Sequence, residues 1–409
     1  MLTSPPVCRT NAPMTFLVDA MRSSAKRAAT AMLLLAVAGC SSLPSQGPDA
    51  AGVVKEANYA NAVTPPRYLV ATLDPHALSV LERAPRQTFS GSFGKAGGAV
   101  STVIGVGDSV SVTLWEAATG GLFSSAATGG VTAGSHSATI PEQIVGRDGS
   151  ITVPYAGRIH VAGLTTKQVE QSVVSRLMGK AIEPQALVTV PRNVSSAVTV
   201  TGEVSNGARV PLNAGGDRIM DVIASAGGVR APVHETFIAL TRGDRTVKAP
   251  MQTLLTRPSE NIYLRPRDVL TVVREPQTFT AFGATGRNAH VTFDAIGITL
   301  EEAIAKVGGL LDTAADPAGV FLLRTEPTSI ARQLDPNYPI DPGATSVNVV
   351  YRINLRDPAT YFVARKFGVR NKDVMYVAHA PTTELYKALQ LFQAVTQPAM
   401  TGLLAARAF

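Results

Sequence analysis

Residue types that commonly carry chemistry are few in this sequence and lie far apart. Its 409 residues include six His and two Cys, and the His residues show no spacing typical of metal ligands. Glu301 and Glu302 are adjacent, so a helix would point them in different directions rather than pair them for acid–base catalysis. Gly94-Lys95 lacks the first Gly of a phosphate-binding loop, and Ala96 stands where Ser or Thr would hold magnesium. These residues predict no metal site and no cofactor.

One candidate nucleophile stands in the segment Gly107–Ser111. This block resembles the one that carries the nucleophile of GDSL-type hydrolases. Their mechanism needs a His base, usually in an Asp-x-x-His motif near the carboxyl end, and no Asp stands three residues before His290 or His379. We therefore interpret Asp108 as a turn residue that opens a strand, and we predict that the chain is not an enzyme. An envelope hydrolase acting from Ser109 is kept as an alternative hypothesis.

Cys40 is the residue with the best-defined chemistry. A short basic segment precedes the apolar stretch Ala28–Ala38, which is too short to span a bilayer as a helix but has the length of a signal-peptide core. The stretch leads into Val37-Ala38-Gly39-Cys40, which resembles the lipobox of bacterial lipoproteins. In such signals the Cys thiol is diacylated and the Cys becomes the new amino terminus. The sequence therefore predicts a signal peptide at 1–39, with Met21 as an alternative start, and a lipid anchor on Cys40.

Export would leave a chain with one Cys and little net charge. Cys8 would be removed with the signal peptide, so no intramolecular disulfide can form. Ser41, rather than Asp, after the Cys resembles a signal for the outer membrane. The removed residues hold four basic side chains and one acidic one, so the formal net charge falls from +7 to +4, and the remaining basic residues are scattered. We expect a lipid-anchored protein with its bulk in the periplasm and no nucleic-acid partner.

The carboxyl terminus carries a second membrane signal. No charged residue occurs between Lys387 and Arg407, a run of 19 residues that as a helix spans about 28 Å, close to the roughly 30 Å of a hydrocarbon core. A mostly small or polar seam follows heptad spacing here, formed by Thr383, Lys387, Gln390, Ala394, Gln397 and Thr401. In lipid such a seam must face other helices or water. Three interpretations stay open: a packed terminal helix, a single bilayer anchor, and one stave of a helical barrel, with Pro398 disturbing the helix.

Between these two signals, the chain is long enough for several domains. A length of 409 residues suggests two to four domains, and 45% apolar residues exclude a disordered chain. Gly and Pro are abundant and aromatic residues make up only 6%, which favours many short strands and turns. Because the sequence has no set of long apolar runs, it is not a polytopic membrane protein.

Residues 99–192 predict a small mixed α/β domain. Val110–Trp115 alternates apolar and polar residues, as a half-buried strand does, and Asp148-Gly149 predicts a hairpin turn. Thr165 and Gln168 have the spacing of a capping box at the start of a helix. The apolar stripe of that helix is formed by Val169, Val173 and Leu177.

Two internal repeats follow, at 197–275 and 277–380. The motif around Gly202 recurs loosely around Gly283, which is 81 residues later. A Gly pair recurs at the same interval, as Gly227-Gly228 and Gly308-Gly309. The helix before each pair repeats its apolar positions in register, namely Ile219, Val222, Ile223 and Ala226, then Leu300, Ala303, Ile304 and Val307.

The same repeats predict caps and an insertion. Asp217 and Thr299 are the predicted N-caps of the two helices, and Thr299 forms a capping box with Glu302. Each repeat ends in a similar strand, and these strands are 105 residues apart, so the second repeat carries about 24 additional residues. We assign them to a Pro-rich insertion at 327–342.

The order of these features resembles the outer-membrane polysaccharide export lipoproteins, the Wza-like family. Ile104–Val112 and Asp148–Leu164 fit the export domain of that family, and Asp357–Phe367 fits the last module of its capsule-export members. The resemblance covers residues 99–409 and the lipobox, and the repeats resemble ligand-binding β-grasp modules, each a sheet over one helix. It implies an α+β, multidomain fold: a small export domain, two β-grasp-like modules, and an amphipathic transmembrane helix at 382–409 that forms a helical barrel in the oligomer.

The resemblance also implies a function. Members form homo-oligomeric rings that pass capsular polysaccharide or exopolysaccharide through the outer membrane, fed by an inner-membrane polysaccharide co-polymerase or export transporter. In this chain the pore-lining residues would be Thr383, Lys387, Gln390, Gln397 and Thr401. Residues 40–98, with several Pro and a Gly-rich tail, are expected to be an extended, lipidated linker or a loose cap. The alternative hypothesis is a periplasmic scaffold that binds glycan or protein without a pore.

Overall fold

The computed structural model describes residues 47–57, 66–84, 87–94, 103–117, 122 and 136–383. The chain divides into two compact units. Unit 1 combines the described parts of 1–82, 279–291 and 299–409, and unit 2 combines those of 83–278 and 292–298.

A three-stranded antiparallel sheet and one helix form the first domain of unit 2. The strand order is β3-β2-β6, and β4 and β5 form a separate hairpin. The elements are β2 Ser109–Glu116, β3 His136–Ile144, β4 Ser150–Val153, β5 Gly157–His160, α5 Thr166–Leu177 and β6 Gln185–Arg192. The capping box is confirmed, because the Thr165 N–H donates to Gln168 Oε1 at 2.9 Å and the Gln168 N–H donates to Thr165 Oγ1 at 3.3 Å. The predicted stripe of Val169, Val173 and Leu177 is fully buried in the core.

A five-stranded sheet over helix α6 forms the first module, also in unit 2. The strand order is β10-β9-β11-β7-β8, in which β7 and β11 are parallel and the other pairs are antiparallel. The elements are β7 Ala197–Gly202, β8 Ala208–Pro211, α6 Ile219–Ser225, η2 Val233–Glu235, β9 Thr236–Arg242, β10 Arg245–Pro250, α7 Met251–Thr256, η3 Pro258–Glu260 and β11 Val269–Arg274. The predicted apolar face of this helix is buried in the module core, namely Ile219, Val222, Ile223 and Ala226.

The amino end of α6 differs from the prediction. Asp217 does not cap the helix: its carboxylate accepts the backbone N–H of Asn213 at 2.7 Å. The Met220 N–H instead donates to the side chain of Asn261 at 3.0 Å. Locally, Asp221 accepts only the N–H of Arg218, so the partner of the Met220 N–H is a residue 41 positions away, which local spacing cannot reveal.

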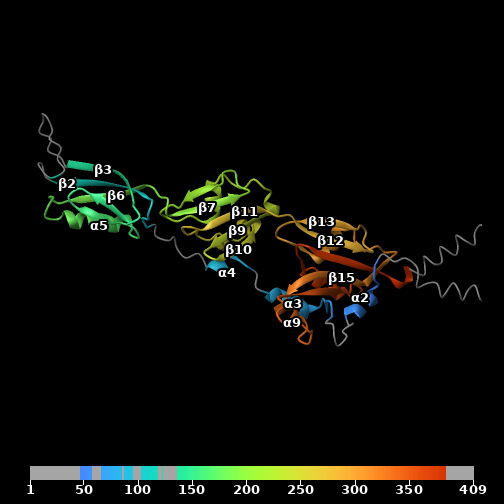
Figure 1. The fold of residues 1–409 in the computed structure, drawn as a ribbon. Helices are drawn as coiled ribbons and strands as arrows, with labels where there is room; N and C mark the ends of the chain where they lie inside the picture. Colours follow the sequence, from blue (N-terminus) through green and yellow to red (C-terminus); the bar gives the residue numbers. More distant parts are fainter. Residues whose placement is uncertain are drawn as a thin grey trace, which may run out of the picture. The chain divides into compact units, whose positions relative to one another are not determined.

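A six-stranded mixed sheet forms the second module, in unit 1 (Figure 1). The strand order is β1-β16-β15-β18-β12-β13. The module contains β12 Gln277–Gly283, β13 Ala289–Phe293, β14 Ile298–Thr299, α8 Leu300–Lys306, β15 Ala315–Pro327, α9 Thr328–Leu334, β16 Ser346–Ile353, α10 Pro358–Ala364, β17 Gly368–Val369 and β18 Asp373–His379. The predicted Thr299–Glu302 capping box is confirmed. Leu300, Ala303 and Val307 are buried as predicted, whereas Ile304 is only half-buried.

The two modules repeat the same close strand approach. Gly202 lies opposite Val272 in a parallel pair, and Gly283 lies opposite Val377 in the equivalent pair. Both glycines have a positive φ, +91° and +89°, and a Cβ atom at either would lie 2.0 Å from the carbonyl oxygen of the facing valine. No residue with a side chain fits there, which explains why the sequence repeat centres on these glycines.

The additional residues of the second module lie within its central hairpin. In the first module β9 and β10 are joined by Gly243-Asp244 alone. The equivalent strands β15 and β16 are joined by residues 328–345, which include α9. Apart from Pro327, which ends β15, the residues 327–342 assigned to the insertion lie in this connection.

The described residues between 47 and 94 differ from the extended linker or loose cap expected for 40–98. They form α2 Ala50–Ala57, β1 Leu69–Thr72, α3 Pro75–Arg83 and α4 Phe89–Phe93. Strand β1 joins the sheet of the second module as the parallel neighbour of β16, and Phe89 of α4 is fully buried in the core of the first module. These elements are short and their partners lie far along the chain, so neither composition nor local periodicity indicates the pairing.

Within the part of the chain that the structure describes, no helix is both long enough and apolar enough to cross a membrane. The predicted amphipathic transmembrane helix at 382–409 lies outside the described residues from residue 384 onward.

Candidate functional site

Most residues predicted to act in membrane attachment and pore lining lie outside the described residues, namely Cys40, Lys387, Gln390, Gln397 and Thr401. Thr383 is described and half-buried. Its N–H donates to the carbonyl oxygen of Ala380 at 2.9 Å, and its hydroxyl donates to the carbonyl oxygen of Ala314 at 3.3 Å. The start of the predicted helix is therefore hydrogen-bonded to the second module.

Both chain segments that lead toward the predicted anchors are held at strand β18. On the amino side, the Tyr376 hydroxyl donates to the carbonyl oxygen of Pro48 at 2.7 Å. On the carboxyl side, the N–H of Ala380, directly after β18, donates to the carbonyl oxygen of Ala314 at 2.8 Å. Pro48 and Ala380, which lie near the two ends of the described chain, are thus both hydrogen-bonded within the second module.

Asp108 opens strand β2, as predicted. Its carboxylate accepts four hydrogen bonds at 2.7–2.8 Å, from the N–H groups of Gly105, Val194 and Ser195 and from the Ser195 hydroxyl. Asp108 is fully buried and Ser109 is only 5% exposed. The pair has no open face toward a substrate, so the geometry does not support the hydrolase hypothesis.

The turn before β2 recurs before β11 and β18. In each turn an Asp carboxylate accepts the N–H of the residue three positions earlier, at 2.7 Å for Asp108 and at 2.8 Å for Asp268 and Asp373. The residue before each Asp has a positive φ, +92° at Gly107, +70° at Arg267 and +69° at Lys372. The same turn therefore starts one strand in the first domain and one in each module.

An Arg–Asp pair locks this turn in both modules. Arg242 on β9 donates to both carboxylate oxygens of Asp268, at 2.9 and 2.7 Å, and Arg324 on β15 forms the same forked contact with Asp373. Each guanidinium lies 5.0 Å from the centre of a phenylalanine ring, Phe93 for Arg242 and Phe367 for Arg324. Such bidentate, ring-stacked geometry is specific to Arg.

The second module surrounds its Arg–Asp pair with further buried charge. Glu326 is fully buried and accepts from Tyr351 Oη at 3.0 Å and from Arg370 at 2.8 Å. The pKa of the Tyr351 phenol lies well above its usual range, mainly because the phenol is buried and secondly because of the charge of Glu326. The hydroxyl therefore stays protonated and acts as a donor. Burial alone would lower the pKa of Arg324, but the hydrogen bond and charge of Asp373 and the charge of Glu326 raise it.

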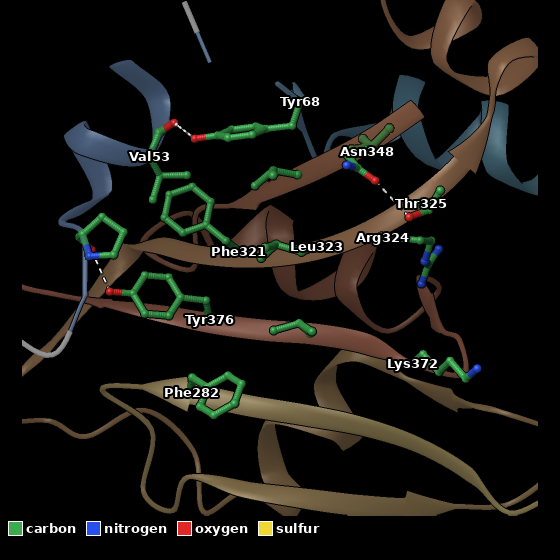
Figure 2. A pocket seen from close by; sticks show the side chains of 14 residues that line it. Val53, Tyr68, Phe282, Phe321, Leu323, Arg324, Thr325, Asn348, Lys372 and Tyr376 are labelled. Atoms are coloured by element: carbon green, nitrogen blue, oxygen red, sulfur yellow. Dashed lines mark hydrogen bonds between the residues drawn. The ribbon is translucent and has the colours of Figure 1, made fainter. Parts of the chain in front are cut away.

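A groove of about 550 Å³ lies on the sheet of the second module beside α2 (Figure 2). One wall of the groove comes from α2 and the segments on either side of it, and its floor comes from β12, β15, β16, β18 and the turn before β18. The lining residues are Pro48, Val53, Tyr68, Phe282, Phe321, Leu323, Arg324, Thr325, Asn348, Val349, Val350, Lys372, Val374 and Tyr376. Helix α2 covers one part of this sheet face, where Val53 packs with Phe321, Val350 and Ala378. The rest is open, and Phe282 and Leu323 are 50% and 39% exposed.

The groove changes from aromatic to polar along the strands. Strand register places Phe282, Tyr376 and Phe321 in one row across β12, β18 and β15. On the polar side Thr325 faces Asn348, and its hydroxyl donates to the Asn348 side-chain oxygen at 3.0 Å. Figure 2 shows Lys372 at the same side as this pair. Burial, together with the nearby carboxylates Asp49 and Glu56, raises the pKa values of Tyr376 and Tyr68.

Sequence reasoning missed this groove. One available signal was the alternation of Phe321, Leu323 and Thr325 along a strand, which places all three on one face. That face could not be recognised as a groove, because one wall is α2 and because Tyr68 precedes β1, both from the segment expected to be a linker.

Comparisons with known proteins match most of the chain. The family described as polysaccharide biosynthesis/export protein matches residues 98–191, and the SLBB domain matches residues 197–255 and 277–377. The capsule polysaccharide export protein BexD of Haemophilus influenzae is 35% identical over 387 residues, which cover 92% of this chain and 97% of that protein. The chain belongs to the polysaccharide biosynthesis/export family. This confirms the resemblance inferred from the sequence.

Two further relatives of this export-family chain carry related names. The capsule polysaccharide export outer membrane protein CtrA of Neisseria meningitidis is 35% identical over 376 residues, covering 90% of this chain and 95% of that protein. The Vi polysaccharide export protein VexA/TviF of Salmonella typhi is 26% identical over 292 residues, covering 71% and 78%. The groove strands β12, β15, β16 and β18 fall within or at the edge of the second SLBB match, whereas α2 and Tyr68 lie outside it.

Proposed function

We propose that this protein is an outer-membrane lipoprotein whose oligomer forms the channel through which capsular polysaccharide or exopolysaccharide leaves the cell. It is an outer-membrane protein of polysaccharide export, and its activity is transport rather than catalysis. One observation carries this conclusion: 35% identity over nearly the whole length of capsule polysaccharide export proteins.

The chain geometry near β18 supports attachment of the second module at the membrane. Six residues separate Cys40 from Gly47, so a lipid on Cys40 lies at most about 25 Å from the described chain. Thr383 lies four residues after the end of β18, and its hydroxyl donates to the carbonyl oxygen of Ala314 in the same module. A lipid anchor and a spanning helix would then hold one module at the inner face of the outer membrane.

The uncharged run after Lys387 supports a wet channel rather than a lone anchor. A single helix in lipid would leave the amides of Gln390 and Gln397 in hydrocarbon, at a cost of about 1 kcal/mol or more each. A homo-oligomeric ring of such helices turns the seam of Thr383, Lys387, Gln390, Gln397 and Thr401 toward water. This wet, weakly charged lumen offers hydroxyl and amide groups to a glycan without holding it tightly.

The transport step is passive in this proposal. The described residues hold no group of three or more potential metal ligands, and the conduit mechanism needs neither a metal nor a cofactor. The driving force comes from an inner-membrane polysaccharide co-polymerase or export transporter that delivers the chain to the ring. A periplasmic glycan- or protein-binding scaffold without a pore is the competing function.

Cysteine accessibility tests the channel directly. Gln390→Cys and Gln397→Cys are expected to react with a small hydrophilic maleimide in the assembled oligomer about tenfold faster than Leu389→Cys and Phe392→Cys. The first pair faces water in the proposed barrel and the second pair faces lipid. Labelling is measured by mass spectrometry of the detergent-extracted oligomer. Equal labelling at all four positions would favour the scaffold.

Fatty-acid labelling tests the anchor. Cells given a clickable fatty acid are expected to label the wild-type protein, whereas Cys40→Ser should lose the label completely because the acylated thiol is absent. Cys8→Ser is the matched control and should keep full labelling, since it lies in the predicted signal peptide. Label retained by Cys40→Ser would contradict the lipoprotein assignment.

A further inference from the structure

We propose that the groove on the second module binds a short acidic segment of the exported polysaccharide, with a carboxylate at Lys372 and the ring of a neighbouring sugar unit against Phe282. This inference rests on the proposed function for the origin of the glycan. The groove itself is defined by the described residues of unit 1 alone.

The aromatic row supplies a surface for the apolar face of a sugar ring. Phe282, Tyr376 and Phe321 lie in register on neighbouring strands, which are about 4.8 Å apart. Phe321 is covered, Tyr376 is half-buried and Phe282 is 50% exposed. An exposed aromatic ring at the edge of a concave surface favours a ligand that is apolar on one side.

The polar side of the groove supplies hydrogen-bond donors. Asn348 uses its side-chain oxygen to accept from Thr325, which leaves its two amide N–H groups without a hydrogen-bond partner among the described residues. The adjacent Thr325 hydroxyl oxygen can still accept. A sugar ring has this same division, with C–H groups on its faces and hydroxyl groups around its edge.

The charge of the groove specifies an anionic ligand. None of the lining residues is Asp or Glu, and two are cations, Arg324 and Lys372. Arg324 is committed to Asp373 and Glu326, whereas exposed Lys372 makes no ion pair within the described parts of the chain. The carboxylates that raise the pKa values of the lining phenols, Asp49 and Glu56, belong to α2 and the residue just before it, and neither lines the groove. A ligand carboxylate next to Lys372 and the Asn348 amide would accept hydrogen bonds from both side chains.

A second copy of the chain fits these observations less well. The cores of protein interfaces are depleted of charge, whereas here a cation and an amide share the groove with the aromatic row. The volume of about 550 Å³ also falls within the range of small-ligand sites rather than of flat protein interfaces.

Calorimetry with a matched pair of sugars tests the proposal. Detergent-purified full-length protein is titrated with trigalacturonate and with its methyl ester, in which each carboxylate is replaced by an uncharged ester of nearly the same shape. The acid is expected to bind about tenfold more tightly than the ester. Lys372→Gln should abolish this difference, while Phe282→Ala should weaken both sugars by a similar factor. Added salt should weaken only the acid.

Two control variants separate the groove from general effects on the protein. Lys366→Gln removes an exposed cation two residues after α10, and Phe362→Ala removes a ring on α10 that is 73% exposed; neither residue lines the groove. Neither should change binding, and all four variants should keep the thermal unfolding temperature of the wild type.

Several results would overturn the acidic-sugar proposal. These are equal affinity for acid and ester, no binding of either at millimolar concentration, or unchanged binding in Lys372→Gln. Loss of oligomer mass in Phe282→Ala would show that the groove is filled by a second copy. None of these outcomes affects the channel proposal, because maleimide accessibility at Gln390 and Gln397 does not depend on the groove.

Discussion

Deletion of residues 384–409 is expected to abolish polysaccharide on the cell surface while the periplasmic part of the protein stays folded. The deletion removes the whole uncharged run and its Gln seam but leaves Thr383 and its hydrogen bond to Ala314 in place. Without the helices the ring has no passage through the hydrocarbon core, so export stops rather than slows. Surface polysaccharide is measured by antibody or lectin binding on intact cells.

A full-length variant controls for loss of the anchor. Gln390→Leu combined with Gln397→Leu keeps the helix and its length but replaces the polar seam by apolar side chains. We expect this variant to remain in the outer membrane and to lose most surface polysaccharide, because the lumen becomes apolar. Normal surface polysaccharide after the deletion would contradict the channel and leave the binding scaffold as the better function.

The repeated modules were predictable because their signals are local and occur twice. The apolar positions of α6 and α8 keep the same spacing, and Gly202 and Gly283 mark the same backbone approach. A single sequence is enough to recognise a pattern that depends on neighbours within about one helical turn, or on a glycine that no other residue can replace. The capping boxes at Thr165 and Thr299 are confirmed for the same reason.

The packing of the described residues between 47 and 94 was not predictable from the sequence, because these residues pack against partners far along the chain. Leu69 of β1 pairs with Val349 of β16, 280 residues later, and the Phe89 N–H donates to Glu260 at 2.7 Å across 171 residues. Four residues of strand and five of helix carry too little periodicity to indicate such contacts. The candidate groove was missed with them, since α2 forms its wall.

The two Arg–Asp pairs are expected to contribute unequally to the stability of the two modules. Arg324→Met is expected to destabilise the second module by about 3–5 kcal/mol, because it leaves Asp373 buried without its cation. Arg242→Met should cost the first module less, about 2–3 kcal/mol, since Arg242 is 17% exposed against 5% for Arg324 and pairs with one carboxylate among the described residues. Arg158→Met removes the exposed pair with Asp148 and should cost at most about 1 kcal/mol.

Hydrogen exchange followed by mass spectrometry resolves these effects by module. In Arg324→Met the amides of β15 and β18 should exchange faster while β9 and β11 keep their protection, and Arg242→Met should produce the reverse pattern. Arg324→Lys should not restore protection, because an ammonium group cannot form the forked contact with Asp373. Unchanged exchange in β15 and β18 of Arg324→Met would mean that the pair contributes little to the module. If the expected pattern holds, the recurring turn and its Arg form a structural unit of each module, and in the second module this unit also supplies Arg324 and Lys372 to the lining of the groove that we assign to glycan binding.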